Sequence, residues 1–226
     1  MQISARTFDK SPALSAAGKF GNFKPESGRD VRKMNVKANP VIEEMKKAWE
    51  LHEILTENGG VFDKVTYDRI FKGIKHRYSA KDVEDFSILM SELQGGAFFP
   101  TSAGFFLSGL INNCNDAEFI IHTKAFAEPI ISIGYRNTKN ITIDGDAGAY
   151  LGDEMVKGTI IVKGNAGDSV GWYMKGGSII VEGDAGYSVG CHMSDGELRI
   201  NGSFKEISQE FPGGKVFHKG RLIVDK

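Results

Sequence analysis

The sequence has few cysteines and almost no net charge, and both shortages narrow the kinds of protein that it can encode. Its 226 residues include only two cysteines, Cys114 and Cys191, which lie far apart and form no C-x-x-C pair. A disulfide framework and a cysteine-based zinc site are therefore not indicated. The formal net charge of -1 gives no overall attraction for nucleic acid or for an acidic membrane surface.

Long apolar runs are missing as well. The opening segment lacks the apolar block of a signal peptide, and no run approaches the roughly 20 residues that span a bilayer. We therefore expect a soluble, cytoplasmic protein with no nucleic-acid partner and no membrane association. Its length is sufficient to bury a substantial core.

Glycine, in contrast, is abundant: the chain has 28, concentrated in the second half. Gly145, Gly164 and Gly183 are separated by steps of 19 residues, which marks an internal repeat. Further glycine columns keep the same step, so we expect the chain to turn at equivalent corners in successive repeats. The expected corners are Gly145, Gly148, Gly152, Gly164, Gly167, Gly171, Gly183, Gly186 and Gly190.

Apolar residues follow the same 19-residue step, in short β-branched segments between the glycines. Residues two positions apart in a strand face the same way, so each segment has one face that can be buried. The pattern predicts a mainly β fold, a parallel β-solenoid with one coil per repeat. The expected inward residues include Ile141, Ile143, Ile160, Val162, Ile179, Val181, Leu198 and Ile200, with Met155, Met174 and Met193 in a further column.

The outward columns support this register, because stacked like charges would repel each other. In one column Asn165 separates Asp146 from Asp184. We interpret the neutral amide between two acids as relief of that repulsion, which indicates that these three positions are stacked.

The first half of the chain has a different pattern. Residues 1–38 are polar and carry eight basic against three acidic side chains. We interpret them as an extended or disordered basic arm, which either lies on an acidic partner or is a solvated tail. Residues 39–96 are expected to form a helical unit of three amphipathic helices. One begins at Pro40, one covers residues 66–77, and one is opened by a capping box at Ser79.

Residues 97–226 are expected to form the β-helix together with segments that close its ends. The apolar segment 97–125 does not distinguish helix from strand by its period, and we expect it to form the first cap, as a short helix and an irregular first coil. Segment 203–219 interrupts the repeat and is the expected last cap. Leu222 and Val224 then restore the inward alternation and predict one more strand.

The glycine-rich segment 145–202 reads GDAGAYLGDEMVKGTIIVKGNAGDSVGWYMKGGSIIVEGDAGYSVGCHMSDGELRING. It resembles the GXGXG-motif family, which includes one of the subunits of formylmethanofuran dehydrogenase and the carboxy-terminal domain of the large subunit of glutamate synthase. The resemblance covers about residues 130–226 and implies a right-handed, single-stranded parallel β-helix. It also implies a scaffold within a larger redox or amidotransfer complex, because the domain is not itself the seat of chemistry in these enzymes.

Two stretches match G-x-S-x-G, the nucleophile-elbow pattern of serine hydrolases. GDSVG would provide Ser169 as the nucleophile, and GYSVG would provide Ser188. A nucleophile elbow connects a strand to a helix, and neither stretch is followed by a helical pattern. The equivalent residue of the preceding coil is Tyr150, which indicates that the glycines are the repeated feature. A small serine hydrolase using Ser169 or Ser188 is the alternative hypothesis.

Cys191 and His192 form a second reactive pair, since a thiolate beside an imidazole can act as a nucleophile or as a metal ligand. Neighbouring residues in a strand point to opposite faces, and the preceding coils provide no third ligand at the equivalent positions. We therefore expect no metal site. The sequence indicates no cofactor site either, because its glycine-rich turns lead to strands rather than to a helix.

One outward column stacks Ile161 on Ile180, where solvent-facing side chains are expected, and Trp172, Tyr173 and Tyr187 lie one corner away. Exposed apolar patches mark interfaces, so these five residues form the candidate interface unless the chain's own helices cover them. The main hypothesis is a non-catalytic scaffold that binds protein subunits of a larger complex or a second copy of itself. A ligand site in the crevice between helices and solenoid is a third possibility.

Overall fold

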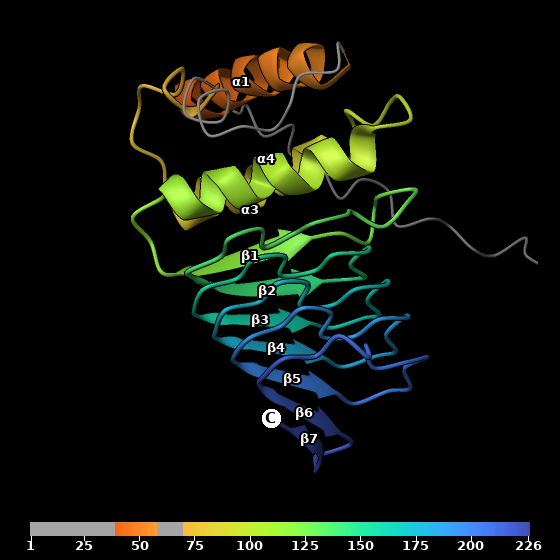
Figure 1. Cartoon of the computed structure of the whole chain (residues 1–226). Coiled ribbons are helices and arrows are strands. Elements are labelled where there is room, and N and C mark those ends of the chain that lie inside the picture. Colours follow the sequence, from red (N-terminus) through yellow and green to blue (C-terminus); the bar gives the residue numbers. More distant parts are fainter. Residues whose placement is uncertain (1–38, 58–69) are drawn as a thin grey trace, which may run out of the picture. The chain divides into compact units, whose positions relative to one another are not determined.

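The computed structural model describes residues 39–57 and 70–226. Within these ranges, helices are followed by a stack of strands (Figure 1). One continuous core of buried side chains runs through both. The expected basic arm, residues 1–38, and the first part of the expected second helix lie outside the described residues.

The helices begin where the sequence supplies capping groups. Helix α1 (Pro40–Glu57) starts after Asn39, whose side-chain oxygen accepts a hydrogen bond of 3.1 Å from the amide two residues on. Helix α3 (Ala80–Met90) starts at the expected capping box of Ser79. Helix α4 (Phe99–Asn113) has a proline in its first turn. None of the described helices is long and apolar enough to cross a membrane.

The expected helix over 66–77 is wrong for most of the part that the structure describes. Only residues 70–71 are helical there, and a turn follows them. The carboxylate of Glu44 accepts hydrogen bonds from the amides of Lys75 (2.8 Å) and His76 (3.0 Å). Because these amides bind α1 instead of carbonyls four residues back, the segment does not continue as a helix.

The strands form the predicted parallel stack, with one strand per coil. Strands β1 to β6 pair in parallel and in chain order, and β7 adds an antiparallel edge. Asn140 pairs with Thr159, and Thr159 with Ser178, which reproduces the 19-residue step. The strands are β1 (Glu118–His122), β2 (Asn140–Asp144), β3 (Thr159–Val162), β4 (Ser178–Val181), β5 (Glu197–Ile200), β6 (Lys215–His218) and β7 (Arg221–Asp225).

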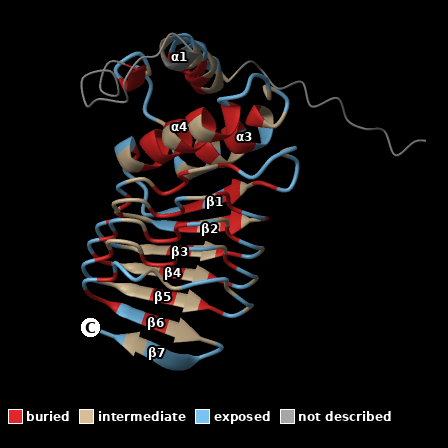
Figure 2. Cartoon of the chain, turned by 45° about the vertical axis from the view of Figure 1, so that its right-hand side comes forward, coloured by how far each residue is buried: buried red, intermediate tan, exposed pale blue. Residues whose placement is uncertain are grey.

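The inward columns expected from the repeat are buried. Ile160, Ile179 and Leu198 are stacked in register, and none of them has exposed surface. Met155 and Met174 are equally buried. Figure 2 shows buried residues recurring from strand to strand down the solenoid. Each buried aliphatic side chain contributes about 1.5–3 kcal/mol, so the stack is held mainly by contacts between neighbouring coils.

The expected corner glycines lie outside the strands, and two positions show why the chain uses glycine there. Gly171 has φ +72°, which favours glycine. A Cβ atom on Gly167 would lie 2.6 Å from the backbone nitrogen of Ala149 in the preceding coil. The first glycine therefore permits the turn, and the second permits the close approach of two coils.

The turns also contain left-handed residues that are not glycine. Ser132, Tyr150, Ser169 and Ser188 occupy one column, with φ between 56° and 61°. A second column, with φ between 49° and 55°, holds Arg136, Glu154, Tyr173 and His192. Both columns show that the repeat begins one coil earlier, at a coil around Ser132. The step from Ser132 to Tyr150 is 18 residues and not 19, so the glycine spacing alone does not reveal this coil.

Helix α4, in the segment expected to form the first cap, packs against the first coil of the solenoid. A Cβ atom on Gly104 would collide with the carbonyl oxygen of Ile131, so the helix backbone touches the first coil. The amide of Ile131 donates to the carbonyl of Pro100 at 3.0 Å. The hydroxyl of Ser108 accepts a bond of 2.9 Å from the amide of Gly134. These bonds satisfy polar groups of the coil edge that would otherwise be buried without partners.

The other end is closed by a hairpin. The expected cap segment 203–219 contains β6, which continues the parallel stack, and β7 then turns back along it. The expected inward position of Leu222 is wrong, since its side chain is 43% exposed. An antiparallel edge strand has no following coil to cover it, and Leu222 therefore remains in solvent.

Candidate functional site

The outer surface of the parallel sheet has an apolar central column. Ile161 pairs in register with Ile180, as expected, and both are half-buried by the columns on either side. Ile120 is 45% exposed at the α3 end of the column. We call this column the sheet face; its members are Ile120, Thr142, Ile161, Ile180, Arg199 and Phe217.

The described helices leave most of the sheet face open. Helix α3 packs on β1, and α4 lies across the first coil at the end of the stack. Neither α1 nor α4 makes extensive contacts with β2 to β5. The alternative, that the chain's own helices cover Ile161 and Ile180, therefore does not hold for the helices that the structure describes.

Polar and charged groups lie at both ends of this column and beside it. The guanidinium of Arg199 lies 4.0 Å from the centre of the Phe217 ring and pairs with Glu197 at 2.7 Å. At the α3 end, the ammonium of Lys124 lies 2.7 Å from the carboxylate of Asp144 and holds the pKa of that carboxyl below its ordinary value. A groove of about 600 Å³ runs alongside, lined in part by Lys124, Asp144, Lys163 and Glu182.

A second surface lies at a corner of the coils and gathers aromatic and ionisable residues. Most of these residues belong to the second left-handed column, which contains Arg136, or directly precede one of its members. Equivalent side chains therefore lie one above another along the stack. We call this set the aromatic corner. Its members are Tyr135, Arg136, Tyr150, Asp153, Glu154, Trp172, Tyr173, Cys191, His192 and Glu210.

The rings of the aromatic corner contact each other in succession. Trp172 lies 4.7 Å from Tyr150 and 5.9 Å from Tyr173, between ring centres. Tyr173 stacks on the imidazole of His192 at 4.5 Å, with 20° between the planes. Of the three aromatic residues expected to form an interface, Trp172 and Tyr173 therefore have their rings in contact. The third, Tyr187, is 55% exposed and makes no ring contact with them in the described chain.

The charged members of the corner form a short network. Glu154 pairs with Arg136 at 3.3 Å and with Lys175 at 3.0 Å, and both cations help to hold its pKa below the ordinary value against burial. Burial, reinforced by the neighbouring charge of Glu154, raises the pKa of Asp153 to about 6. A carboxyl group that titrates near neutral pH can exchange protons with a bound molecule. Sequence reasoning did not identify Asp153.

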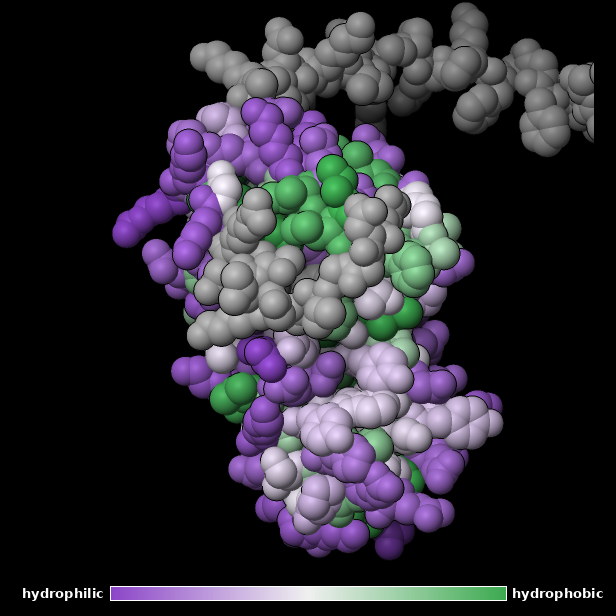
Figure 3. Space-filling model, turned by 45° about the horizontal axis from the view of Figure 1, so that its top comes forward, coloured by the Kyte–Doolittle hydropathy of each residue, from purple (hydrophilic) through white to green (hydrophobic). Residues whose placement is uncertain are grey.

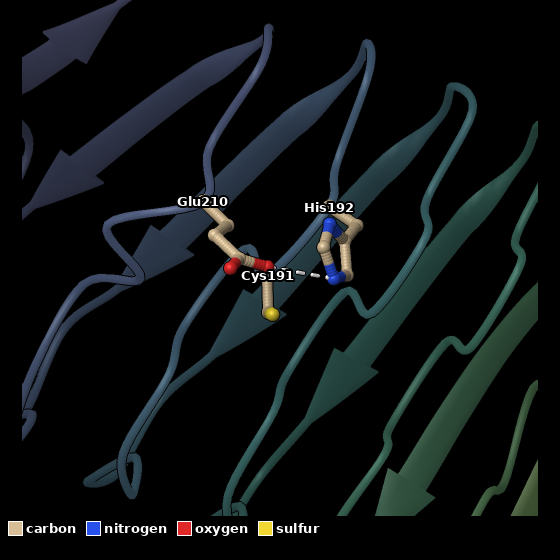
Figure 4. Close-up of side chains that lie close together, drawn as sticks. All are labelled: Cys191, His192 and Glu210. Carbon is tan, nitrogen blue, oxygen red and sulfur yellow. Dashed lines mark ion pairs between the residues drawn. The ribbon is translucent and has the colours of Figure 1, made fainter.

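Cys191 and His192 come together with a third ligand-bearing side chain, Glu210 (Figure 4). The ligand atoms of the three residues lie within 4.8 Å of one another. The expectation that Cys191 and His192 diverge is wrong, because they lie in a turn where His192 has φ +55° and not in a strand. Glu210 comes from the segment after the repeat breaks, so the 19-residue step could not identify it.

The two serines of the G-x-S-x-G stretches lie in these turns. Ser169 is buried and Ser188 half-buried, and both have the positive φ of a nucleophile elbow. Tyr150 has the same φ in the same column, so this conformation belongs to the turn. The solenoid imidazoles instead have other partners: His122 pairs with Glu84 and Asp144, His192 pairs with Glu210, and His218 bonds the carbonyl of Gly202. Neither serine hydroxyl bonds an imidazole in the described chain.

Comparison of the chain with protein-family models, with curated proteins and with solved structures finds no match in any of the three. The arguments for function therefore come from the geometry of the sheet face and of the aromatic corner. The GXGXG resemblance continues as a hypothesis that depends on the glycine columns.

Proposed function

We propose that this chain is a non-catalytic scaffold, a β-helix related to the GXGXG-motif domains, that binds another protein of a larger complex through the sheet face. The observation that carries the proposal is the stacked pair of Ile161 and Ile180 on the outside of the sheet, with Ile120 beyond Thr142 in the same column. The described helices leave this pair open. These side chains lie outside the core, so a partner can cover them without disturbing the packing of the solenoid. Burial of their apolar surface would stabilise the complex.

The surroundings of the column support a protein partner. Interfaces between proteins combine an apolar centre with a polar border, and here the border carries both signs of charge, from Arg199 and Glu197 to Lys124 and Asp144. The backbone beneath is held by hydrogen bonds between coils, such as Lys163 N–H to Ile143 at 3.0 Å. A rigid surface loses little conformational freedom on binding, which favours affinity.

The test is site-specific photo-crosslinking in cells that produce the chain. A photoreactive phenylalanine analogue at position 161 or 180 is expected to yield a discrete crosslinked species, which mass spectrometry identifies as a partner or as a second copy. The matched control places the same analogue at Val156, which is apolar and 46% exposed but lies outside the strands.

A second crosslinking experiment, with a substitution in the sheet face, distinguishes specific binding from accidental proximity. Ile180→Lys is expected to abolish the crosslink from position 161 while leaving the melting temperature close to that of the wild type, because Ile180 faces outward. The scaffold proposal fails if positions 161 and 180 give no products, or the same products as position 156.

A further inference from the structure

We propose that Cys191, His192 and Glu210 form a binding site for a divalent transition-metal ion, Zn²⁺ by preference, with at least one coordination position open. This site lies at the aromatic corner and does not depend on the scaffold proposal. It rests on three side chains of different chemistry that converge from two successive coils.

The separation of the ligand atoms suits one ion. The imidazole Nε2 of His192 lies 2.9 Å from a carboxylate oxygen of Glu210. The Cys191 sulfur lies within 4.8 Å of one ring nitrogen of His192 and of one carboxylate oxygen of Glu210. Zinc binds sulfur, nitrogen and oxygen at about 2.0–2.3 Å, which places tetrahedral ligands roughly 3.5 Å apart. The three ligand atoms therefore lie close to the spacing that a single bound ion requires.

The backbone holds the ligands in place before an ion binds. The amide of His192 donates a hydrogen bond of 2.7 Å to the carbonyl of Glu210, which joins the two coils at the site. The Tyr173 ring stacks on the imidazole and restricts its rotation. The left-handed turn at His192 keeps its side chain beside that of Cys191. Such fixed geometry is what a metal site requires from its surroundings.

The chemistry of the three ligands selects the class of ion. A thiolate, an imidazole and a carboxylate together suit Zn²⁺ and its neighbours in the first transition row, whereas Mg²⁺ and Ca²⁺ prefer oxygen ligands alone. The side chains of His192 and Glu210 are 34% and 70% exposed, so an ion can reach them from solvent. Three protein ligands leave a position for water or for a donor group of a bound molecule, as in catalytic zinc sites.

The first experiment is a titration of the full chain with Co²⁺ under reducing conditions. Tetrahedral Co²⁺ bound by a thiolate is expected to show sulfur-to-metal charge-transfer absorption that saturates at one ion per chain, and added Zn²⁺ is expected to displace it. Cys191→Ser is expected to lose the charge-transfer band. Cys114→Ser is the matched control and should keep it, because Cys114 is buried elsewhere.

The other two ligands are tested by affinity. Glu210→Gln and His192→Asn are each expected to weaken Zn²⁺ binding by about tenfold or more in calorimetric titrations. Equal affinity in these variants and the wild type would show that a single cysteine binds the metal, and would overturn the proposal. The absence of saturable Co²⁺ absorption in the wild type would do the same.

A measurement on the wild-type chain guards against variants that do not fold. Saturating Zn²⁺ is expected to slow alkylation of Cys191 by iodoacetamide, measured at that residue by peptide mass spectrometry. Alkylation of Cys191 at an unchanged rate in the presence of Zn²⁺ would count against the site irrespective of any substitution.

Discussion

The solenoid and the helices bury their apolar side chains in different ways. In the solenoid each inward position stacks on its equivalent in the next coil, as Ile160 does on Ile179. The helices instead surround single large rings: Phe106 of α4 lies within 5.4 Å to 5.7 Å of Trp49, Phe71 and Phe86. In Figure 3 the strongly hydrophobic side chains in view gather in the upper part of the molecule, where the helices are.

The difference extends to polar groups. In the solenoid, Asn165 accepts a hydrogen bond of 2.9 Å from the amide of Asp184, and Asp184 accepts one from the amide of Ser203. The same type of bond thus recurs from coil to coil at the surface. Among the described helices, α1 buries the imidazole of His52, whose Nε2 lies 2.9 Å from the carbonyl oxygen of Ser102. The interactions of the solenoid repeat from coil to coil and can be predicted from the sequence. Each contact of the helices occurs once, so no repeat predicts it.

The largest expected effect concerns the two faces of one strand. Ile179→Ala removes a fully buried side chain between two coils and should lower the free energy of unfolding by about 2–5 kcal/mol. Ile180→Ala, at the next position but facing outward, should cost less than about 1 kcal/mol. Denaturant unfolding of both variants measures the difference. Equal losses would contradict the stacked register.

A second prediction uses the pH dependence of the helical part. Burial lowers the pKa of His52 from 6.5 to about 4. Below pH 6.5 the unfolded chain binds a proton that the folded chain does not bind until about pH 4, so stability falls as the pH decreases through this window. The two pKa values correspond to a loss of about 3 kcal/mol. His52→Gln should remove this part of the profile, as urea unfolding at pH 7 and pH 4.5 would show.

Asp153 in the solenoid makes stability depend on pH in the opposite direction. The folded pKa of Asp153, about 6, lies above its ordinary 3.8, because burial disfavours the charged carboxylate. Charged Asp153 therefore destabilises the fold at neutral pH, and this destabilisation is relieved as the pH falls from about 6 towards 4. The effect of His52 must therefore be measured as the difference between the wild type and His52→Gln at each pH. An identical profile for both chains would contradict a neutral His52 in the folded state.

A smaller effect is expected from a corner glycine. Gly167→Ala places a methyl group against the backbone of the preceding coil and should destabilise the chain by about 1–3 kcal/mol. Gly95→Ala is the matched control, because a Cβ atom there meets nothing within 4 Å. Thermal unfolding compares the two. If Gly167→Ala melted at as high a temperature as Gly95→Ala, the two coils could accommodate the methyl group without loss of stability, and the prediction would be wrong.

The smallest predicted effect tests the hydrogen bonds between surface side chains and the next coil. Asn165→Ala removes the acceptor for the amide of Asp184 and should cost about 0.5–1.5 kcal/mol, since water partly replaces the lost bond. Lys163→Ala, exposed in the same coil, should be close to neutral. If both variants unfold at the same denaturant concentration, the bond makes no net contribution.

These hydrogen bonds revise one interpretation of the sequence. The column of Asp146, Asn165 and Asp184 was expected to avoid stacked like charges. In the structure Asp146 accepts a bond of 2.7 Å from the amide of Asn165, and Asn165 accepts one from Asp184 in turn. Each position therefore needs a short side chain with an acceptor oxygen, which aspartate and asparagine provide equally well. The prediction of stacking is confirmed, and its physical reason is different.

The solenoid follows from the sequence alone, because stacked parallel coils repeat the same environment every 19 residues and the side chains must repeat with it. The sequence could not place what lacks a period. The expected helix ends after residue 71, and the amides of Lys75 and His76 bind the carboxylate of Glu44, which lies in α1. Glu210 meets Cys191 and His192 only because the interrupted last coil returns it to the aromatic corner. Such contacts join residues through space, and only the tertiary structure decides them.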